Sequence, residues 1–360
     1  MLEQSPKLAQ LWFHDAPVNC AAFSPDGRRV VTGTGRIIDF MPDKKTPGQV
    51  QVWDVETGQR VGRPLVHGSS ISQTRFSPDG RTIAKASADG TARIWKADSG
   101  EPVATLPHSN SLVSVVFSRD GKLLATGSHG HTARVWHAQS GQPVTEALPH
   151  LDTVLGVDFS PDGNWLVTVS TDCFVRLWDA KRGTNRLALR GHSGSIVGGV
   201  QWSPDGSRWV TASTDKTAKL WDASKEGLLA TFNHDNWVWR AAFSPDGERV
   251  GTASEDGTAC VWDVRTGAAR TPPLLHNSML RHIEFSPDGL MVVTASDDHT
   301  ARVWDAMTGR PLTPPLHHGD VVPQAAFSPE GRRVATASTD KTATKLAGSA
   351  LNNQHSDASQ

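Results

Sequence analysis

The segment A-S-A-D-G-T-A-R-I-W, residues 86–95, recurs along the chain in close copies that end at a tryptophan. Three of these copies are A-S-T-D-K-T-A-K-L-W at 212–221, A-S-E-D-G-T-A-C-V-W at 253–262 and A-S-D-D-H-T-A-R-V-W at 295–304. The tryptophans that end the units are 41 to 43 residues apart, and they are Trp53, Trp95, Trp136, Trp178, Trp221, Trp262 and Trp304. A fixed period of this length predicts a repeat architecture rather than a series of independent domains.

Each unit has the pattern of four short strands separated by turns. Residues 71–76 form the first strand of one unit and stop at the turn sequence Pro78-Asp79-Gly80. Asp89-Gly90 separates the second strand from the third, as expected for a tight turn. No stretch holds a helical period long enough to compete. The sequence therefore predicts an all-β protein.

Several features of the unit together resemble the WD-repeat β-propeller family. They are the F-S-P-D-G turn, a histidine nine or ten residues before it, the Ser-x-Asp turn and the closing Trp-Asp. The resemblance covers residues 7–346, and the high mutual similarity of the repeats resembles bacterial members of the family. It implies one domain over 1–346, built of four-stranded blades around a central channel.

The two ends of the repeat region complement each other. Residues 7–13 align with a fourth strand that has no partners before it, and the last repeat, within 321–346, lacks a fourth strand. We expect 7–13 to complete the last blade, which gives a closed ring of eight blades without exposed edge strands. A seven-bladed ring with the last repeat detached is the alternative.

The last repeat also departs from the pattern at its end. Leu346 replaces the tryptophan after one extra residue, which predicts an irregular strand. Residues 347–360 are polar and match no repeat, so we expect a disordered tail there.

The resemblance also implies a hydrogen-bonded structural set of histidine, serine, aspartate and tryptophan in each blade. A buried indole N–H, an imidazole and a carboxylate each need a partner, and they can supply one another. The five complete sets are His67, Ser87, Asp89 and Trp95; His150, Ser170, Asp172 and Trp178; His192, Ser213, Asp215 and Trp221; His234, Ser254, Asp256 and Trp262; and His276, Ser296, Asp298 and Trp304.

Composition argues against several classes of partner. The net charge is −1 with Lys and Arg scattered, so no nucleic acid or anionic membrane surface is predicted as a partner. The chain has no signal-peptide pattern and no apolar run of about 18 residues, so no membrane span is predicted. Cys20, Cys173 and Cys260 lie singly in different repeats, which indicates a reducing, cytoplasmic location.

Nothing in the pattern predicts catalysis, a cofactor or a metal site. The Ser, Asp and His of a hydrolase recur here in blade after blade, which a single active site would not do. No phosphate loop or dinucleotide fingerprint occurs. His129 and His131 could supply two metal ligands, but a closed site needs about four. We therefore expect a monomeric protein without enzymatic activity.

Two tryptophans lie at positions that the repeat pattern does not account for. Trp237 and Trp239 flank Val238 just after a repeat histidine, and the resemblance places such positions at the top-face entrance of the channel. The equivalent places in the next two repeats include Met279, Arg281 and Val321. Tryptophan and arginine dominate binding hot spots, so we expect a partner-binding patch here. The alternative is that one of the two tryptophans packs into the core.

An insertion in the first repeat, at 35–48, is the second candidate surface because it carries the apolar residues Ile38 and Phe40. It either caps the channel mouth or binds a partner. The predicted function is a scaffold that binds a protein or peptide on the top face. The alternatives are a small-molecule or metal-sensing propeller, and a regulatory fragment of a larger repeat-containing signalling protein.

Overall fold

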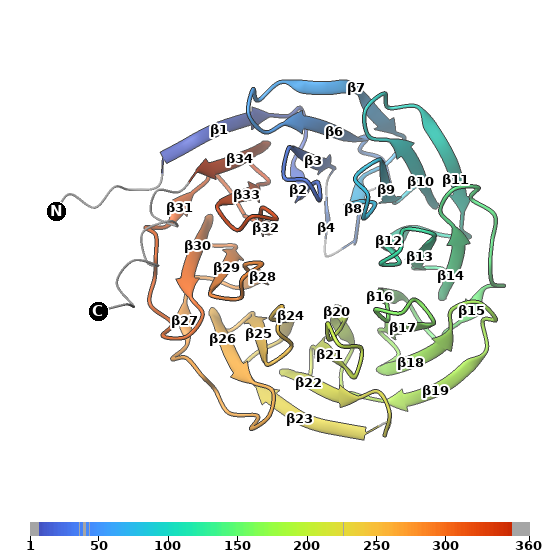
Figure 1. Ribbon diagram of the computed structural model, residues 1–360, viewed down its shortest axis with the longest axis vertical. Helices are drawn as coiled ribbons and strands as arrows, with labels where there is room; N and C mark the ends of the chain where they lie inside the picture. The colour runs from blue at the N-terminus through green and yellow to red at the C-terminus, as the bar shows by residue number, and fades with distance from the viewer. Residues whose placement is uncertain (1–6, 36, 39–40, 43, 226, 348–360) are drawn as a thin grey trace.

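Eight four-stranded antiparallel sheets surround a central channel as the blades of a closed propeller (Figure 1). The computed structural model describes residues 7–35, 37–38, 41–42, 44–225 and 227–347. The prediction of eight blades is confirmed. The predicted tail lies outside the described residues, apart from its first residue, which ends a strand.

The strands of each blade run outwards from the channel in chain order, except that β1 (Lys7–Phe13), the first strand of the chain, is the outermost strand of blade 8. Blades 1 to 4 comprise β2 (Val18–Phe23), β3 (Arg29–Thr34), β6 (Gly48–Asp54) and β7 (Arg60–His67); β8 (Ile71–Phe76), β9 (Thr82–Ser87), β10 (Thr91–Lys96) and β11 (Pro102–Pro107); β12 (Leu112–Phe117), β13 (Leu123–Ser128), β14 (Thr132–His137) and β15 (Leu148–Pro149); and β16 (Val154–Phe159), β17 (Trp165–Ser170), β18 (Phe174–Asp179) and β19 (Asn185–Arg190).

The second half of the ring repeats this arrangement. Blades 5 to 8 comprise β20 (Ile196–Trp202), β21 (Arg208–Ser213), β22 (Thr217–Asp222) and β23 (Gly227–Asn233); β24 (Val238–Phe243), β25 (Arg249–Ser254), β26 (Thr258–Asp263) and β27 (Leu274–Leu275); β28 (Leu280–Phe285), β29 (Met291–Ser296), β30 (Thr300–Asp305) and β31 (Leu316–His317); and β32 (Gln324–Phe327), β33 (Arg333–Ala337), β34 (Thr342–Ala347) and β1 (Lys7–Phe13).

Two sets of turns define the two faces of the propeller. We call the face with the aspartate turns, such as Asp89-Gly90, and the connections between blades the top face. The face with the S-P-D-G turns, such as 77–80, is the bottom face. The insertion after β3 forms the two-stranded sheet of β4 (Ile37–Ile38) and β5 (Met41–Pro42). Because it joins the second and third strands of its blade, it belongs to the top face.

The first strand of the chain closes the ring. β1 pairs antiparallel with β34, with Phe13 opposite Thr342. Trp12 is 1% exposed and its ring stacks on Trp53 of blade 1, with centroids 5.8 Å apart. β1, the outer strand of blade 8, is therefore hydrogen-bonded within its own blade and also packed against blade 1. The predicted closure of the ring is confirmed.

The predicted irregularity of β34 is wrong. β34 pairs with β33 without a register shift, and Leu346 lies opposite Val334 as Trp221 lies opposite Trp209 in blade 5. The strand therefore holds no extra residue: Lys345 takes the buried position that Leu220 holds in blade 5, and its amine donates to the carbonyl of Val55. The register shift falls in β1 instead, between Leu8 and Gln10.

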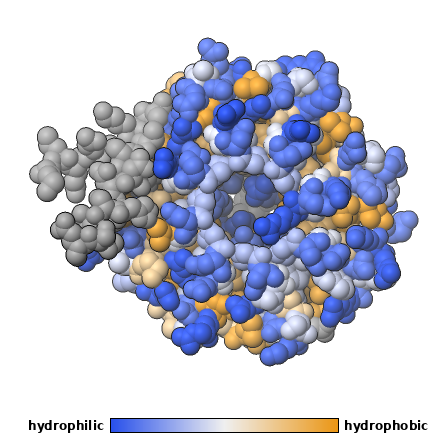
Figure 2. Space-filling model, in the orientation of Figure 1, coloured by the Kyte–Doolittle hydropathy of each residue, from blue (hydrophilic) through white to orange (hydrophobic). Residues whose placement is uncertain are grey.

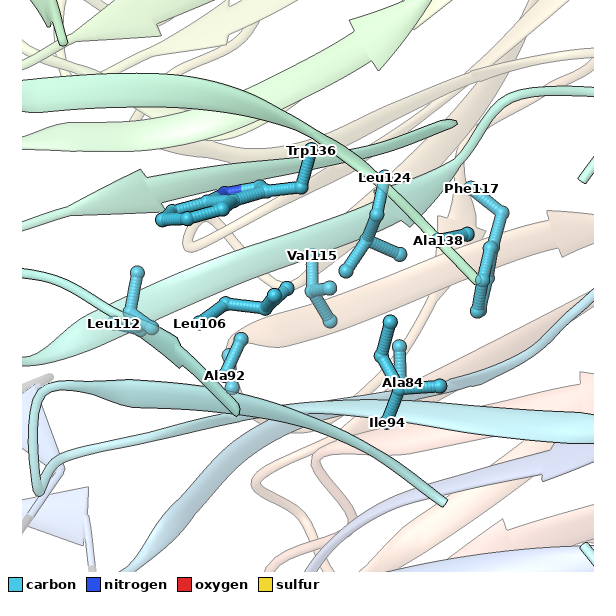
Figure 3. Packing of buried hydrophobic residues seen from close by; sticks show 11 residues of the cluster. Ala84, Ala92, Ile94, Leu106, Leu112, Val115, Phe117, Leu124, Trp136 and Ala138 are labelled. Carbon is cyan, nitrogen blue, oxygen red and sulfur yellow. The ribbon is translucent and has the colours of Figure 1, made fainter. Parts of the chain in front are cut away.

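The hydrophobic cores lie between neighbouring blades. In the cluster between blades 2 and 3, Ile94 and Leu106 of one sheet pack with Val115, Leu124 and Trp136 of the next (Figure 3). All five are less than 2% exposed. Each blade is apolar on both faces and needs a neighbour on each side, so the closed ring is the unit that buries them.

Side chains also join the innermost strands of neighbouring blades. The first strand of each blade is an edge, so its outward backbone N–H groups need acceptors. Carboxylate and amide oxygens of one blade accept these N–H groups from the next. The pairs are Gln73 with Val115 (2.8 Å), Asp158 with Trp202 (2.8 Å), Gln201 with Phe243 (2.8 Å), Glu284 with Phe327 (2.9 Å) and Gln324 with Ala21 (3.3 Å).

Candidate functional site

The repeat histidine, a threonine and the tryptophan form a buried hydrogen-bonded chain. In blade 7, His276 Nε2 lies 2.8 Å from the Oγ1 of Thr294, which also accepts the indole N–H of Trp304 at 2.8 Å. The other ring nitrogen of His276 lies 2.9 Å from Asp298 Oδ2. Blades 5 and 6 contain the same chain through Thr211 or Thr252.

The hydroxyl that joins histidine to tryptophan is therefore not the serine of the predicted sets. In blade 7, Ser296 lies at the end of its strand, where it accepts the N–H of Asp298 at 3.1 Å and donates to the carbonyl of Met279 at 2.9 Å. Ser213 and Ser254 bond the backbone of their turns in the same way. The threonine two residues earlier is in mid-strand, within reach of the indole.

Blade 2 lacks this threonine. His67 keeps its bond to Asp89 at 2.8 Å, but Lys85 replaces the threonine and is fully buried. The Nε2 of His67 and the Nε1 of Trp95 are buried and have no hydrogen-bond partner among the described residues. Ser87 bonds the backbone of its turn, so the predicted set of blade 2 is only partly connected.

In blade 4, too, the hydrogen bonds differ from those of the predicted set. His150 bonds Thr168 at 2.8 Å, which also accepts the indole N–H of Trp178, but its Nδ1 bonds the carbonyl of Leu148 at 3.0 Å. Asp172 instead forms an ion pair with Arg176 at 2.8 Å, because a guanidinium is a stronger partner for a carboxylate than a neutral imidazole. Ser170 donates to the carbonyl of Asp152.

The protonation states of His276 and Asp298 favour a structural role over acid–base chemistry. Burial lowers the pKa of His276, so its imidazole is neutral at pH 7. Burial opposes ionisation of Asp298, but hydrogen bonds from Thr300, the N–H of Asn277 and His276 lower its pKa to about 2. No proton therefore moves between the two groups near neutral pH.

The two tryptophans outside the repeat lie together on the top face. Trp237 is 37% exposed, Trp239 is half-buried, and their ring centroids are 5.8 Å apart at an interplanar angle of 55°. Val238, between them, is fully buried. Val238 pairs with Ser254 and Arg240 with Ala253, so a β-bulge at Trp239 leaves that residue outside the regular pairing. The same shift occurs in the first strands of blades 1 to 4 and 7, so the bulge belongs to the repeat and the indole is what distinguishes blade 6.

The neighbouring blades extend this surface. Met279 and Val321 are half-buried at the corresponding positions of blades 7 and 8. Arg281 is half-buried and forms an ion pair with Asp297, whose Oδ2 lies 2.7 Å from its Nη2. We call Trp237, Trp239, Met279, Arg281 and Val321 the rim patch.

Sequence reasoning missed two acidic residues beside the rim patch. The N–H of Glu255 donates to the carbonyl of Trp237 at 2.8 Å, and that of Asp297 donates to Met279 at 2.9 Å. The Oε2 of Glu255 is buried and has no hydrogen-bond partner among the described residues. Both residues occupy the variable position of the Ser-x-Asp turn. The residue at this position varies from repeat to repeat, although the serine and aspartate beside it recur. This variation could have pointed to the two acidic residues.

The insertion in blade 1 reaches toward the centre of the ring, where Figure 1 shows β4. Lys44 is anchored over the next blades: its amine donates to Asn110 at 3.0 Å, and its carbonyl accepts the hydroxyl of Ser69 at 2.7 Å. Phe40 lies outside the described residues, and Ile38 is described only as the backbone partner of Met41.

The predicted pair of histidines does not converge with further ligands. His129 lies 3.2 Å from the Thr153 hydroxyl, and His131 lies 3.7 Å from Asp152. Among the described residues, no three His, Cys, Asp or Glu side chains are placed to hold a metal ion. The same part of the chain contains no helix of the length and apolarity that a membrane span needs.

Comparison with known families agrees with this geometry. The WD40 family, described as "WD domain, G-beta repeat", matches residues 6–43, 59–96, 100–137, 141–179, 183–222, 226–263, 274–305 and 310–344. The chain belongs to the WD40 repeat family. Proteins of this family are typically non-enzymatic scaffolds for protein interactions.

Individual relatives match this WD40 protein over short segments. WD repeat-containing protein 1 of Mus musculus is 33% identical over 97 residues, which are 26% of this chain and 14% of that protein. Serine-threonine kinase receptor-associated protein of Dictyostelium discoideum is 37% identical over 79 residues, 22% of this chain and 23% of that protein. Taf5 of Schizosaccharomyces pombe, a subunit of the SAGA and TFIID complexes, is 32% identical over 101 residues, 26% of this chain and 15% of its own.

The fold as a whole is similar to a designed protein. The crystal structure of the computationally designed Ika8 protein superposes with a TM-score of 0.82 at 25% identity, over 95% of this chain and all of that one.

Proposed function

We propose that this WD40 protein is a non-catalytic scaffold that binds a segment of a partner protein on its top face, at the rim patch. The observation that carries the proposal is the pair of adjacent indoles at Trp237 and Trp239, one of them 37% exposed and neither part of a core cluster. A buried tryptophan in this fold is far less accessible: Trp12 and Trp209 are 1% and 0% exposed.

The backbone under the indoles is held in place without a ligand. The carbonyl of Trp237 accepts both the N–H of Glu255 at 2.8 Å and the hydroxyl of Ser254 at 3.0 Å. Its N–H donates to the side chain of Asn236 at 2.9 Å. A surface ordered in advance loses little conformational entropy when a partner binds, which favours affinity.

The charges beside the patch indicate the chemistry of the partner. Arg281 is balanced by Asp297, whereas the Oε2 of Glu255 is buried without a hydrogen-bond partner among the described residues. A lysine or arginine of the partner would pair with the half-buried carboxylate group of Glu255 while its apolar neighbours cover the indoles. We therefore expect a segment with an apolar anchor next to a basic residue.

We place this scaffold in the cytoplasm as a monomer. The three cysteines are unpaired, which supports a reducing compartment. β1 completes blade 8 from the same chain, so the ring closes without a strand from a second copy.

Affinity capture from extract of the source cells tests the proposal. Immobilised wild type is compared with Trp237→Ala/Trp239→Ala and with Leu151→Ala, which removes an apolar side chain that is 76% exposed in the top-face connection between blades 3 and 4. We expect a protein that the wild type and Leu151→Ala retain and the folded double variant loses. Equal retention by all three would place the binding surface elsewhere.

A further inference from the structure

The bottom end of the channel contains a cavity of about 570 Å³ that is separate from the rim patch. It is lined by the ends of the innermost strands and by the S-P segments of the turns that follow them. Figure 2 shows the hollow at the centre of the propeller and the hydrophilic side chains around it. A volume of this size is within the range of small-molecule sites.

Two arginines line this cavity from opposite sides of the ring. Arg75 extends from β8 in blade 2 and Arg240 from β24 in blade 6, four blades away (Figure 1). The Nε of Arg240 is buried and has no hydrogen-bond partner among the described residues. Arg75 donates to the carbonyl of its neighbour Thr74 at 3.3 Å. Neither guanidinium forms an ion pair within the part of the chain that the structure describes.

The acidic groups near the two arginines have other partners. Asp158 accepts the N–H of Trp202, and Glu284 accepts the N–H of Phe327. Burial raises the pKa of Asp158 to about 7, so this carboxyl is only partly ionised at neutral pH, and burial also raises the pKa of Glu284. Burial also keeps His282, the remaining titratable group here, neutral by lowering its pKa.

The two guanidiniums therefore form a positively charged pair inside a cavity, with N–H donors that the protein leaves unused. Guanidinium matches the geometry of phosphate oxygens, and the low dielectric of a buried site strengthens the attraction. We propose that Arg75 and Arg240 bind a small phosphate-bearing anion between them at the bottom of the channel. The site goes beyond the scaffold function, because it lies inside the channel and its lining contains none of the rim-patch residues.

Isothermal titration calorimetry with inorganic pyrophosphate tests this site. We expect one anion per chain, and affinity about tenfold or more weaker in Arg75→Gln and in Arg240→Gln, as for the loss of one strong charged contact. Arg119→Gln is the matched control, because Arg119 is exposed in a bottom-face turn. A general attraction of anions to this face would be weakened as much by the control as by the cavity variants.

Folding of the variants is checked by their thermal unfolding, since both arginines are largely enclosed. Arg75→Lys and Arg240→Lys keep the charge but lose the paired donors, and we expect them to bind pyrophosphate more weakly than wild type while staying folded. A second readout needs no variant: pyrophosphate should raise the Tm of the wild type, and sodium chloride at equal ionic strength should not. Absence of binding by the wild type, or unchanged affinity in the arginine variants, would overturn the proposal.

Discussion

The side-chain nitrogen of Lys85 lies 4.7 Å from the centroid of the Trp95 indole and donates to the carbonyl of Leu65 at 3.1 Å. The other seven repeats carry a threonine at this position. The lysine thus occupies the place of the hydroxyl that links histidine to tryptophan elsewhere, and it leaves an imidazole nitrogen and an indole N–H without partners among the described residues. Blade 2 contains a local defect in an otherwise regular ring.

Lys85→Thr should stabilise the protein. The threonine hydroxyl would restore the bonds to His67 and Trp95, and each satisfied group contributes about 1–3 kcal/mol to the free energy of unfolding. Chemical denaturation measures the change. Lys122→Thr, at an exposed lysine of blade 3, is the control and should alter stability by less than about 0.5 kcal/mol. A destabilised Lys85→Thr would show that the amine is the better partner.

The advantage of Lys85→Thr should depend on pH. Burial, with a smaller contribution from Arg93, lowers the pKa of Lys85 to about 6 against the opposing effect of Asp89. In the unfolded chain the pKa is about 10.4, so between these values the unfolded state binds more protons and wild-type stability rises with pH. The stability gap between variant and wild type should therefore be widest near pH 6 and narrow towards pH 9. Denaturation curves of both proteins across this range measure it, and a constant gap would contradict the shifted pKa.

Removal of one linking threonine should destabilise a regular blade. Thr294→Val keeps the shape of the side chain but leaves His276 and Trp304 without their shared hydroxyl, at a cost of about 1–3 kcal/mol for each orphaned group. Thr105→Val, at an exposed position of β11, is the matched control. The two variants are compared by urea denaturation. Equal stability of the two would mean that the hydrogen-bonded chain contributes nothing.

Closure of the ring by β1 predicts contrasting effects at two adjacent residues. Trp12 is 1% exposed and stacks on Trp53, whereas Phe13 is 66% exposed. Trp12→Ala should lower the free energy of unfolding by about 3–5 kcal/mol, and Phe13→Ala by less than about 0.5 kcal/mol. Hydrogen exchange of β34 amides should also accelerate in Trp12→Ala. Similar losses in both variants would contradict the packing of β1 against blade 1.

The architecture could be predicted because every repeat carries its own turn and strand signals. A period near 42 residues determines the number of blades, and the unpartnered strand at 7–13 indicates how the ring closes. The sequence could not predict which hydroxyl group links the repeat histidine to the tryptophan. Thr294 and Ser296 are two residues apart and point to the same side of a strand, so only the position of the indole distinguishes them.

The sequence also could not predict which of several possible partners a side chain would pair with. Asp172 and Asp298 occupy the same turn position, yet one pairs with Arg176 and the other with His276. The arginine pair of the channel joins residues 165 positions apart, Arg75 and Arg240, and becomes visible only when blades 2 and 6 face each other across the ring. Trp237 and Trp239 could be predicted as candidates because they interrupt the repeat, whereas the exposure of their side chains depends on the fold.

Site-specific photo-crosslinking tests the proposed scaffold function most directly. A benzophenone side chain is placed at Trp237 in one protein and at Leu151, in the top-face connection between blades 3 and 4, in another. Both proteins are irradiated in living source cells. The rim patch predicts a crosslinked partner protein from position 237, absent from position 151, with an apolar residue beside a lysine or arginine at the crosslinked site. Crosslinks from position 151 alone, or none from position 237, would contradict the assignment of the rim patch as the binding surface.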